Sequence, residues 1–579
     1  MFNQSLSMAK ASFRALNINF QVLLLSLFLG MVCFLVLAPL IWTIISSFVV
    51  SKPWEPMVYG LGGWKEAFNS PGILKSIYNT FSLAIIRQFV ALILGILLAW
   101  VLSRTDVPLK GWMEFMFWLS FFMPALPITM GWVLAFDPKV GLVNLWLAKL
   151  PLVNGPVFNI YSFWGIVWAH LTATTLGVKV MLLTPAFRNM DAAMEEAART
   201  AGASMWTTLR SIVIPLMAPA ILVTTILGLI RALEAFEIEL ILGFRVGIDV
   251  YSTRIHSMIE HDPMGGIAPA SALSSFFLVI LLGLVALNRI YIGKRQYTTL
   301  TGKYSNRITP LGRWKYPIFA LILLIVSMIT VIPIAFLLLG TFMTVFGFFD
   351  LPQVWTLEHW TAVLQDNTFL NSLFNTFLIG LGAAVCGVIF YSFIAYLIVK
   401  RQFVGKSLLD FVSWLPWSIP GILLGFGLLW TSLNTPFLKA LHGTTYLLIL
   451  AIVVKSMPFG IQFMKTSMLQ LSDELEEAAR MCGGSWFSTY RRILFPLTLP
   501  MLIVVGLLVF NSAARDISTL VLLGTADTRT LSLLMLDWIT GGGSPEKAMA
   551  IGMVIVILVV FASLLARMLG GRLIVKSGE

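Results

Sequence analysis

The residues best placed for chemistry are charged side chains that interrupt long apolar stretches. Two such stretches, 215–243 and 497–523, hold most of them. The side chains concerned are Arg231, Glu234, Glu237, Glu239, Arg515 and Asp516. A charge inside a lipid bilayer is costly, so such residues either serve a function or pair with one another. We therefore predict a polar stripe that lines a solute pathway. The alternatives are self-neutralising pairs that lock helices together, or a position nearer the outer interface.

The arrangement of these charges is partly repeated. Arg231 lies three residues before Glu234, which brings the two side chains within pairing distance on a helix. Glu237-Ile238 matches Asp516-Ile517, so an acid recurs at one position of both stretches. Three cations lie in other apolar stretches. We expect Lys179 and Lys455 to extend towards a membrane boundary, and Arg87 has no obvious partner in the sequence.

No group of residues has the spacing of a catalytic or metal site. The three cysteines, Cys33, Cys386 and Cys482, are far apart. The segment 256–262 contains two histidines and two acids, but the matching segment around Gly542-Gly543 has no histidine, so we predict no metal there. A GxxxxGK[ST] phosphate loop is missing as well. We therefore predict a chain that is not an enzyme and binds no cofactor.

The amino-acid composition indicates what kind of structural elements contain these charged residues. Of 579 residues, 58% are hydrophobic and 11% are charged, whereas soluble domains have roughly 25% charged residues. The chain therefore belongs in a lipid bilayer. A net charge of +12 fits basic loops on the cytoplasmic side of a membrane better than it fits nucleic-acid binding.

Twelve apolar stretches are long enough to cross a bilayer, which takes about 20 residues. They are 22–49, 79–103, 113–136, 160–187, 215–243, 270–292, 316–347, 374–399, 408–432, 445–470, 497–523 and 549–570. Each must be helical, because lipid offers the backbone no hydrogen-bond partner. Pro124, Pro127, Pro416 and Pro420 should break the third span of each half. The predicted fold is an all-α integral membrane protein with twelve transmembrane helices.

Basic residues orient these spans. The segment 294–315 carries six Lys or Arg residues and no acid, whereas the segment 347–371 carries three acids and no Lys or Arg. Because basic loops stay in the cytoplasm, we predict that 294–315 and both termini are cytoplasmic. The expected chain is a membrane protein that crosses the bilayer many times.

The chain repeats itself. KSIYNT at 75–80 matches NSLFNT at 371–376, and each opens a span. Six spans per half give both halves the same orientation, so they are parallel repeats. The predicted division is a first half over 1–293, a basic linker over 294–315 and a second half over 316–579.

A second repeated segment lies between the fourth and fifth spans of each half, over 191–215 and 472–496. EEAARTAGASMWTTLRSIVIP in the first half matches EEAARMCGGSWFSTYRRILFP in the second. The matched residues are Glu195, Glu196, Ala197, Ala198, Gly202 and Pro215, and Glu476, Glu477, Ala478, Ala479, Gly483 and Pro496. Glu and Ala favour a helix, the glycine allows a turn through positive φ, and the proline is tolerated at a helix start. Small alanines allow close approach of another surface. We predict a helix–turn–helix that docks onto a partner.

This pattern resembles the EAA loop of type I ABC importer permeases, and the resemblance extends over most of the chain. It implies that each loop couples to one of two copies of a cytoplasmic ATPase, which would hold ATP and magnesium. It also implies a location in the bacterial inner membrane, an external or periplasmic substrate-binding protein, and a small-molecule or ion substrate. Within this family, the fused chain looks most like the permeases for ferric iron, with relatives for thiamine and 2-aminoethylphosphonate. Residues 514–538 look closest to the ferric iron and 2-aminoethylphosphonate branches, and ferric iron is the expected substrate. The alternative class is an ion-coupled secondary transporter, which needs no docking loop in both halves.

Overall fold

Long apolar runs become long helices. The computed structural model describes residues 2–51, 56–151, 155–188, 190, 193–262, 265–293 and 308–576. The helices of the first half are α1 (Phe2–Ser46), α2 (Gly62–Asn69), α3 (Ile73–Arg104), α4 (Lys110–Phe122), α5 (Ala125–Phe136), α6 (Leu142–Leu147), α7 (Phe163–His170), α8 (Leu176–Arg188), α9 (Ala193–Thr200), α10 (Met205–Thr208), α11 (Ile214–Leu233), α12 (Tyr251–His261) and α13 (Ile267–Gly293). Short π or 3-10 turns in this half are η1 (Leu171–Thr175), η2 (Leu209–Val213), η3 (Glu239–Gly243) and η4 (Phe244–Val246).

The second half repeats this order. Its helices are α14 (Lys315–Val326), α15 (Ile332–Phe342), α16 (Glu358–Gln365), α17 (Asn367–Lys400), α18 (Lys406–Trp414), α19 (Gly421–Asn434), α20 (Pro436–Lys439), α21 (Thr445–Leu469), α22 (Glu474–Met481), α23 (Trp486–Thr489), α24 (Phe495–Leu497), α25 (Leu499–Ala514), α26 (Leu531–Thr540) and α27 (Pro545–Lys576). Its short turns are η5 (Gly312–Trp314), η6 (Ser327–Val331), η7 (Leu415–Ser418) and η8 (Tyr490–Leu494). Most of the predicted linker, 294–307, lies outside the described residues.

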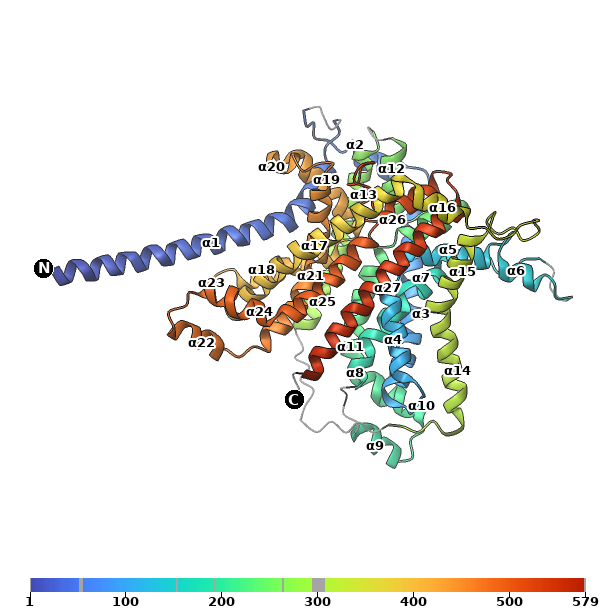
Figure 1. The fold of residues 1–579 in the computed structure, drawn as a ribbon, viewed down its shortest axis with the longest axis horizontal. Helices are drawn as coiled ribbons and strands as arrows, with labels where there is room; N and C mark the ends of the chain where they lie inside the picture. Colours follow the sequence, from blue (N-terminus) through green and yellow to red (C-terminus); the bar gives the residue numbers. More distant parts are fainter. Residues whose placement is uncertain are drawn as a thin grey trace.

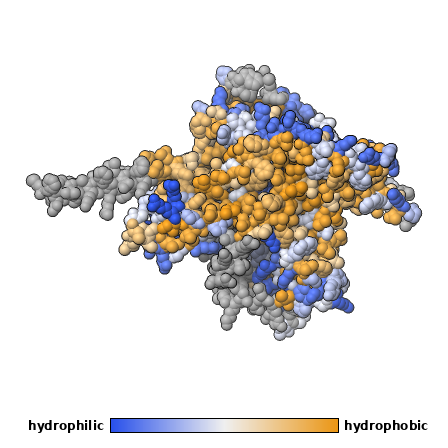
Figure 2. All heavy atoms as spheres, viewed as in Figure 1, coloured by the Kyte–Doolittle hydropathy of each residue, from blue (hydrophilic) through white to orange (hydrophobic). Residues whose placement is uncertain are grey.

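The predicted membrane spans are confirmed. Within the described part of the chain, nine helices are long and apolar enough to cross a bilayer, and three bent helix pairs bring the number to twelve. Apolar side chains form a broad band across the body of the molecule, and hydrophilic residues gather at its margins (Figure 2). The all-α membrane fold follows from this arrangement.

Both third spans break where their prolines predict. α4 and α5 meet at an angle of 104°, with Pro124 between them. In the second half, α18 with η7 meets α19 at 115°, with Pro420 at the break. Proline has no backbone N–H and crowds the preceding turn, so a helix that reaches it tends to bend or stop.

The fifth spans are shorter than predicted. α11 ends at Leu233 rather than at residue 243, and α25 ends at Ala514 rather than at residue 523. In the first half, the Arg87 guanidinium donates a hydrogen bond to the carbonyl of Ala232, which lies in the last turn of α11. Glu234 follows as the C-cap residue, so a side chain from another helix satisfies part of the end of α11. Glu234 and Glu237 are therefore not on neighbouring turns of one helix.

The two halves interlock through their first spans. α1, from the first half, packs against α19 of the second, and Gly427 of α19 faces the backbone of Pro39. In the reciprocal contact, α15 packs against α5, and Gly131 of α5 faces the backbone of Pro333. Each glycine lets two helix backbones approach closely. The crossing holds two parallel repeats together as one body.

The short helices divide between the two ends of the bundle. In Figure 1, α2, α12, α16, α20 and α26 lie along the upper margin, whereas α9 with α10 and α22 with α23 project from the lower and left margins. The N-terminal part of α1 extends beyond the body on the side of α22 and α23 (Figure 1). The two repeated EAA segments are therefore separate projections on the same side of the band.

Candidate functional site

The first EAA segment folds as an elbow, defined here as residues 193–213. α9 stops after Thr200, and Gly202 turns the chain with φ +84°. The N–H of Ala203 then donates to the carbonyl of Ala198 at 3.0 Å. This bond and the left-handed glycine form a Schellman cap, which satisfies a free carbonyl at the helix end. After the turn, α10 and η2 run on into α11, so Pro215 lies in a continuous helix rather than at a separate start.

The second elbow, residues 474–497, has the same turn. Gly483 has φ +79°, and its N–H donates to the backbone carbonyl of Arg480 at 2.9 Å. The N–H of Gly484 donates to the carbonyl of Ala479 at 2.8 Å. Pro496 lies in α24, and a 75° bend separates α24 from α25. Gly202, Ala197, Gly483 and Ala478 are all exposed, so these parts of the elbows face outward. The predicted helix–turn–helix geometry is present in both halves.

The first glutamate of each pair faces the protein rather than the solvent. Glu195 is buried and lies 3.6 Å from the guanidinium of Arg104, at the end of α3. Glu476 is buried as well, 3.7 Å from Arg401, which follows α17, and 3.1 Å from Arg480. These basic residues were missed by sequence reasoning, although AWVLSR and AYLIVK are matched in the two halves. Each pair ties an elbow to the end of a second span.

The outward surface of the elbows is unusually apolar for a polar end of the molecule. In the first elbow, Met194 is 56% exposed and Trp206 is 63% exposed. In the second, Met481 is 89% exposed and Phe487 is 51% exposed, and the carboxylate-bearing Glu477 is exposed beside them. Large exposed apolar side chains that gather on a projection mark a contact surface. The side chain of Glu196 lies outside the described residues.

The two elbows are held differently. In the second, the Tyr396 ring stacks on Trp486, with centroids 6.3 Å apart, and the Arg401 guanidinium lies over both rings. Lys400 donates to Asp473 at 2.6 Å, which lowers the pKa of that carboxyl. In the first, Arg104 donates to the carbonyl of Met190. The second elbow thus has an aromatic brace, and the described residues of the first elbow form no such brace.

The end of the linker lies beside the first elbow. The Thr309 N–H donates to the carbonyl of Arg104 at 2.8 Å, and the Leu311 N–H donates to Asp106 at 2.8 Å. Lys315 lies 3.1 Å from the same Asp106 carboxylate. The Leu311 N–H and the Lys315 ammonium lower the pKa of Asp106. The start of the second half is therefore fixed to the segment that follows α3.

Most of the predicted pathway residues meet at one place, the junction. We define it as Arg231, Glu234, Glu237, Lys455, Arg515 and Asp516. Arg231 pairs with Glu234 at 2.6 Å, as their spacing predicts, and Lys455 pairs with Asp516 at 2.5 Å.

Four of these residues make contacts between the halves. Lys455 lies 3.8 Å from Glu234, and Arg515 donates to the carbonyl of Phe121 at 2.8 Å. The Arg231 guanidinium lies over the ring of Trp417, 5.9 Å from its centroid. The junction therefore joins the ends of both fifth spans to the breaks of both third spans.

Glu239 does not join this group. Its carboxylate lies 2.7 Å from Nε2 of His170 and 3.4 Å from the guanidinium of Arg87, and all three residues belong to the first half. Arg87 and Glu239 are fully or almost fully buried. The partner of Arg87 could not be read from the sequence, because 152 residues separate the two side chains.

The two lysines of the fourth spans do not extend towards a boundary, contrary to our expectation. Lys179 is 1% exposed, and its ammonium donates to the carbonyl of Thr224 at 3.0 Å. The ammonium of Lys455 forms an ion pair with Asp516 within the bundle. In both cases, the side chain turns inward to an acceptor on the fifth span or on the segment after it.

The Asn-Thr pair that recurs in both halves has a structural role that was not predicted from the sequence. Asn79 donates to the carbonyl of Asp249 at 3.1 Å, and Asn375 donates to that of Asp527 at 2.7 Å. The hydroxyl of the next residue, Thr80 or Thr376, accepts the first N–H of α12 or α26, at 3.0 and 2.9 Å. The Asn-Thr of the KSIYNT repeat therefore fixes the short helix that follows each fifth span.

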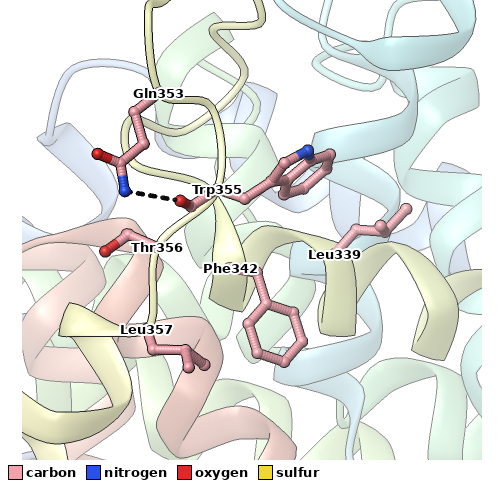
Figure 3. Close-up of a pocket in the computed structure, with 6 residues that line it drawn as sticks. All are labelled: Leu339, Phe342, Gln353, Trp355, Thr356 and Leu357. Atoms are coloured by element: carbon pink, nitrogen blue, oxygen red, sulfur yellow. Dashed lines mark hydrogen bonds between the residues drawn. The ribbon is translucent and has the colours of Figure 1, made fainter.

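Two other features lie away from the junction. The imidazole of His256 lies 3.3 Å from Glu260, on α12. A hollow of about 520 Å³ lies beside the end of α15, lined by Leu339, Phe342, Gln353, Trp355, Thr356 and Leu357 (Figure 3). All of its lining residues come from one segment of the second half and none is charged, so it is not a passage between the halves.

Comparison with known proteins identifies this architecture. The family model described as "Binding-protein-dependent transport system inner membrane component" matches residues 91–295 and 383–575, once in each half. The chain belongs to this family. It is therefore a multi-pass inner-membrane permease, and the match occurs twice, as the internal repeat requires.

Individual relatives agree with this assignment. A probable ABC transporter permease protein, y4fN of Sinorhizobium fredii, is 26% identical over 88% of this chain and 89% of its own length. The ferric transport system permease protein FbpB of Actinobacillus pleuropneumoniae is 29% identical over 70% of this chain, and the match spans 58% of that relative. A solved bacterial ABC transporter involved in the import of the polysaccharide alginate aligns with a TM-score of 0.40 and 22% identity, over 49% of this chain and all of that one.

Proposed function

We propose that this permease is the membrane-spanning subunit of an ATP-driven importer, and that its two elbows dock onto two copies of a cytoplasmic ABC ATPase. The observation that carries the proposal is the paired elbows. Each turns at a left-handed glycine, is tied to a second span through a buried glutamate, and exposes apolar side chains. A secondary transporter has no use for two such surfaces. In this proposal, ATP and magnesium bind the partner, and this chain is not an enzyme.

The proposed cargo is ferric iron, delivered by an external or periplasmic binding protein. Support comes from relatives whose names specify ferric transport, and residues 514–538 resemble the ferric iron and 2-aminoethylphosphonate branches. Thiamine, 2-aminoethylphosphonate or another small solute could use the same mechanism. The proposed pathway runs between the halves, along Arg231, Glu234, Glu237, Arg515 and Asp516 of the junction. Glu239, which we predicted on the same stripe, lies in the buried contact with Arg87 and His170.

Uptake by cells tests the cargo. Cells that lack this chain should lose energy-dependent uptake of radioactive ferric iron, and expression of the chain should restore it. Unlabelled ferric iron should compete with the label, whereas thiamine and 2-aminoethylphosphonate should not. Purification of the chain from its native membrane should also recover an ATPase. Unchanged iron uptake in the deletion strain, with loss of another solute's uptake, would replace iron as the cargo.

The proposed orientation has the elbows, the linker and both termini in the cytoplasm. Thr207, on the first elbow, and Gln353, in the loop after α15, are both exposed. A cysteine at Gln353 should react with an impermeant thiol reagent in intact cells, because that loop is free of basic residues. A cysteine at Thr207 should react only after the cells are opened. The reverse pattern would contradict this topology.

A further inference from the structure

One contact between oppositely charged side chains joins the two halves at the junction, in addition to the hydrogen bond from Arg515 to the Phe121 carbonyl, and it is longer than the ion pairs within each half. The ion pair within the first half, Arg231–Glu234, is 2.6 Å long, and that within the second half, Lys455–Asp516, is 2.5 Å long. The contact between the halves, from Lys455 to Glu234, is 3.8 Å long, which is beyond hydrogen-bond distance. A row of four alternating charges is thus tight at both ends and loose in the middle.

We propose that Lys455 is a gate residue, whose contact with Glu234 closes the pathway between the halves at this level and opens during transport. This inference rests on the proposed transport function, because only a transporter needs its halves to separate here. It assigns a role to a lysine that its sequence context suggested to be a boundary residue.

The contact between Lys455 and Glu234 is suited to repeated opening, because the positive and negative charges on each side of it are equal in number. If the halves part between Lys455 and Glu234, the first half keeps one cation and one anion, Arg231 and Glu234. The second half also keeps one of each, Lys455 and Asp516. An isolated charge in a medium of low polarity is strongly unfavourable, whereas a pair that stays together loses little. The junction can therefore separate without leaving an unpaired ion from these four residues.

The acceptors around Lys455 hold it at the boundary between the halves. Asp516 accepts the N–H of Thr519 at 2.9 Å as well as the lysine ammonium, so its carboxylate is fixed by its own backbone. Ser518 lies 3.4 Å from the same ammonium. Gly421, at the start of α19, leaves the space that these groups occupy, because a Cβ there would clash with Ser518. Lys455 is therefore positioned by the second half and extends towards the first.

Lys179 provides a matched control. It lies on the fourth span of the other half and is also largely buried, but its ammonium donates a hydrogen bond to the Thr224 carbonyl within its own half, and among the described residues it forms no ion pair. A change at Lys179 removes a buried cation from a fourth span without affecting a contact between the halves. A gate residue and an ordinary buried lysine should therefore respond differently to the same substitution.

Thiol accessibility measures the gate without ATP or cargo. Ala235 lies in the break after α11, directly beside Glu234, and is partly exposed. We would place a cysteine at Ala235 in a chain whose three cysteines are replaced by serine, in lipid nanodiscs. An impermeant methanethiosulfonate then reports how open the junction is. Lys455→Gln should raise the labelling rate about fivefold, the range for loss of one partly exposed ion pair.

Companion variants separate opening from misfolding. Glu234→Gln removes the same contact but leaves Lys455 paired with Asp516, so it should raise labelling to a similar degree. The double variant should raise labelling by less than the two single changes combined, because they share one contact, although each change also removes a pair within its own half. Lys455→Arg should retain the slow rate, and Lys179→Gln should not change it.

Two results would overturn the gate: unchanged labelling in both Lys455→Gln and Glu234→Gln, or an equal rise in Lys179→Gln. Transport is measured separately, as uptake by cells that carry the same variants. Failure of the wild-type chain to support ATP-driven uptake would refute the proposed function, and the labelling result would still show whether Lys455 holds the halves together.

Discussion

Replacement of both elbow glycines by valine should abolish ATP-driven uptake. Gly202 and Gly483 have φ of +84° and +79°, and a β-branched residue is strongly disfavoured there, at a cost of roughly 1–2 kcal/mol or more per site. The Schellman turn would open, and the second helix of each elbow would leave its position. We expect uptake to fall at least about tenfold, with little ATPase recovered with the purified chain, because the two costs act on one docking event.

The surroundings of the glycines make this prediction specific to the backbone. A Cβ at Gly202 or Gly483 would meet no atom within 4 Å, so crowding within the chain contributes nothing. Asparagine tolerates positive φ, and the double asparagine variant should therefore keep most of the uptake. Gly72, with φ +80° and equally open surroundings, lies before α3 at the other end of the bundle. Gly72→Val should leave ATPase binding intact. Full uptake in the double valine variant would refute the coupling role.

Local sequence features predicted the elements well, because each element depends on nearby residues. Apolar length specified the spans, Pro124 and Pro420 specified the breaks, and Gly202 and Gly483 specified the turns. Tertiary contacts determined the rest. The end of α11 depends on the contact of Arg87 with Ala232, across 145 residues, and no periodicity in the sequence encodes that contact.

For the charged residues too, the sequence predicted pairs that are close in the chain but not pairs between different helices. Arg231 and Glu234 are three residues apart, and their pairing followed from helix geometry. The partners of Glu239 and Asp516 lie on other helices, so six charges on a predicted stripe separated into a junction and a buried contact. An alignment of the two halves shows part of the reason. The positions that match Arg87, His170 and Glu239 are Ala383, Ala451 and Ser518.

Loss of one member of the Arg87–His170–Glu239 group should destabilise the first half severely. Arg87 is 2% exposed and the Glu239 side chain is fully buried, so Arg87→Met would leave a buried carboxylate with only His170 beside it. Removal of one partner from a buried ion pair typically costs about 3–5 kcal/mol. We expect less folded chain in the membrane and earlier aggregation on heating in detergent. Wild-type thermal stability in Arg87→Met would refute this.

Removal of the whole group should be much milder than removal of one member. Buried ionic groups replaced together by apolar residues of similar volume often leave stability unchanged. The second half already folds with Ala383 and Ala451, both fully buried, at the matching positions. Arg87→Met/His170→Leu/Glu239→Met should therefore be more stable than Arg87→Met alone. If the triple variant were the less stable of the two, the charges would contribute favourably as a set.

Glu237 and Glu239 are close in the chain but differ in their contacts, so substitutions at these two acids can separate a role in transport from a role in folding. Glu237 lies two residues before Glu239, yet among the described residues its carboxylate has no hydrogen-bond or ion-pair partner, and it is partly exposed. Glu237→Gln removes a carboxylate that makes no close ion pair, although it attracts the buried Arg515, so thermal stability should fall less than in Glu239→Gln. Uptake should fall if this carboxylate faces the cargo. Glu239→Gln should show the opposite balance, with a large loss of folded protein. Equal destabilisation by the two variants would mean that both acids are structural, and that the pathway runs elsewhere.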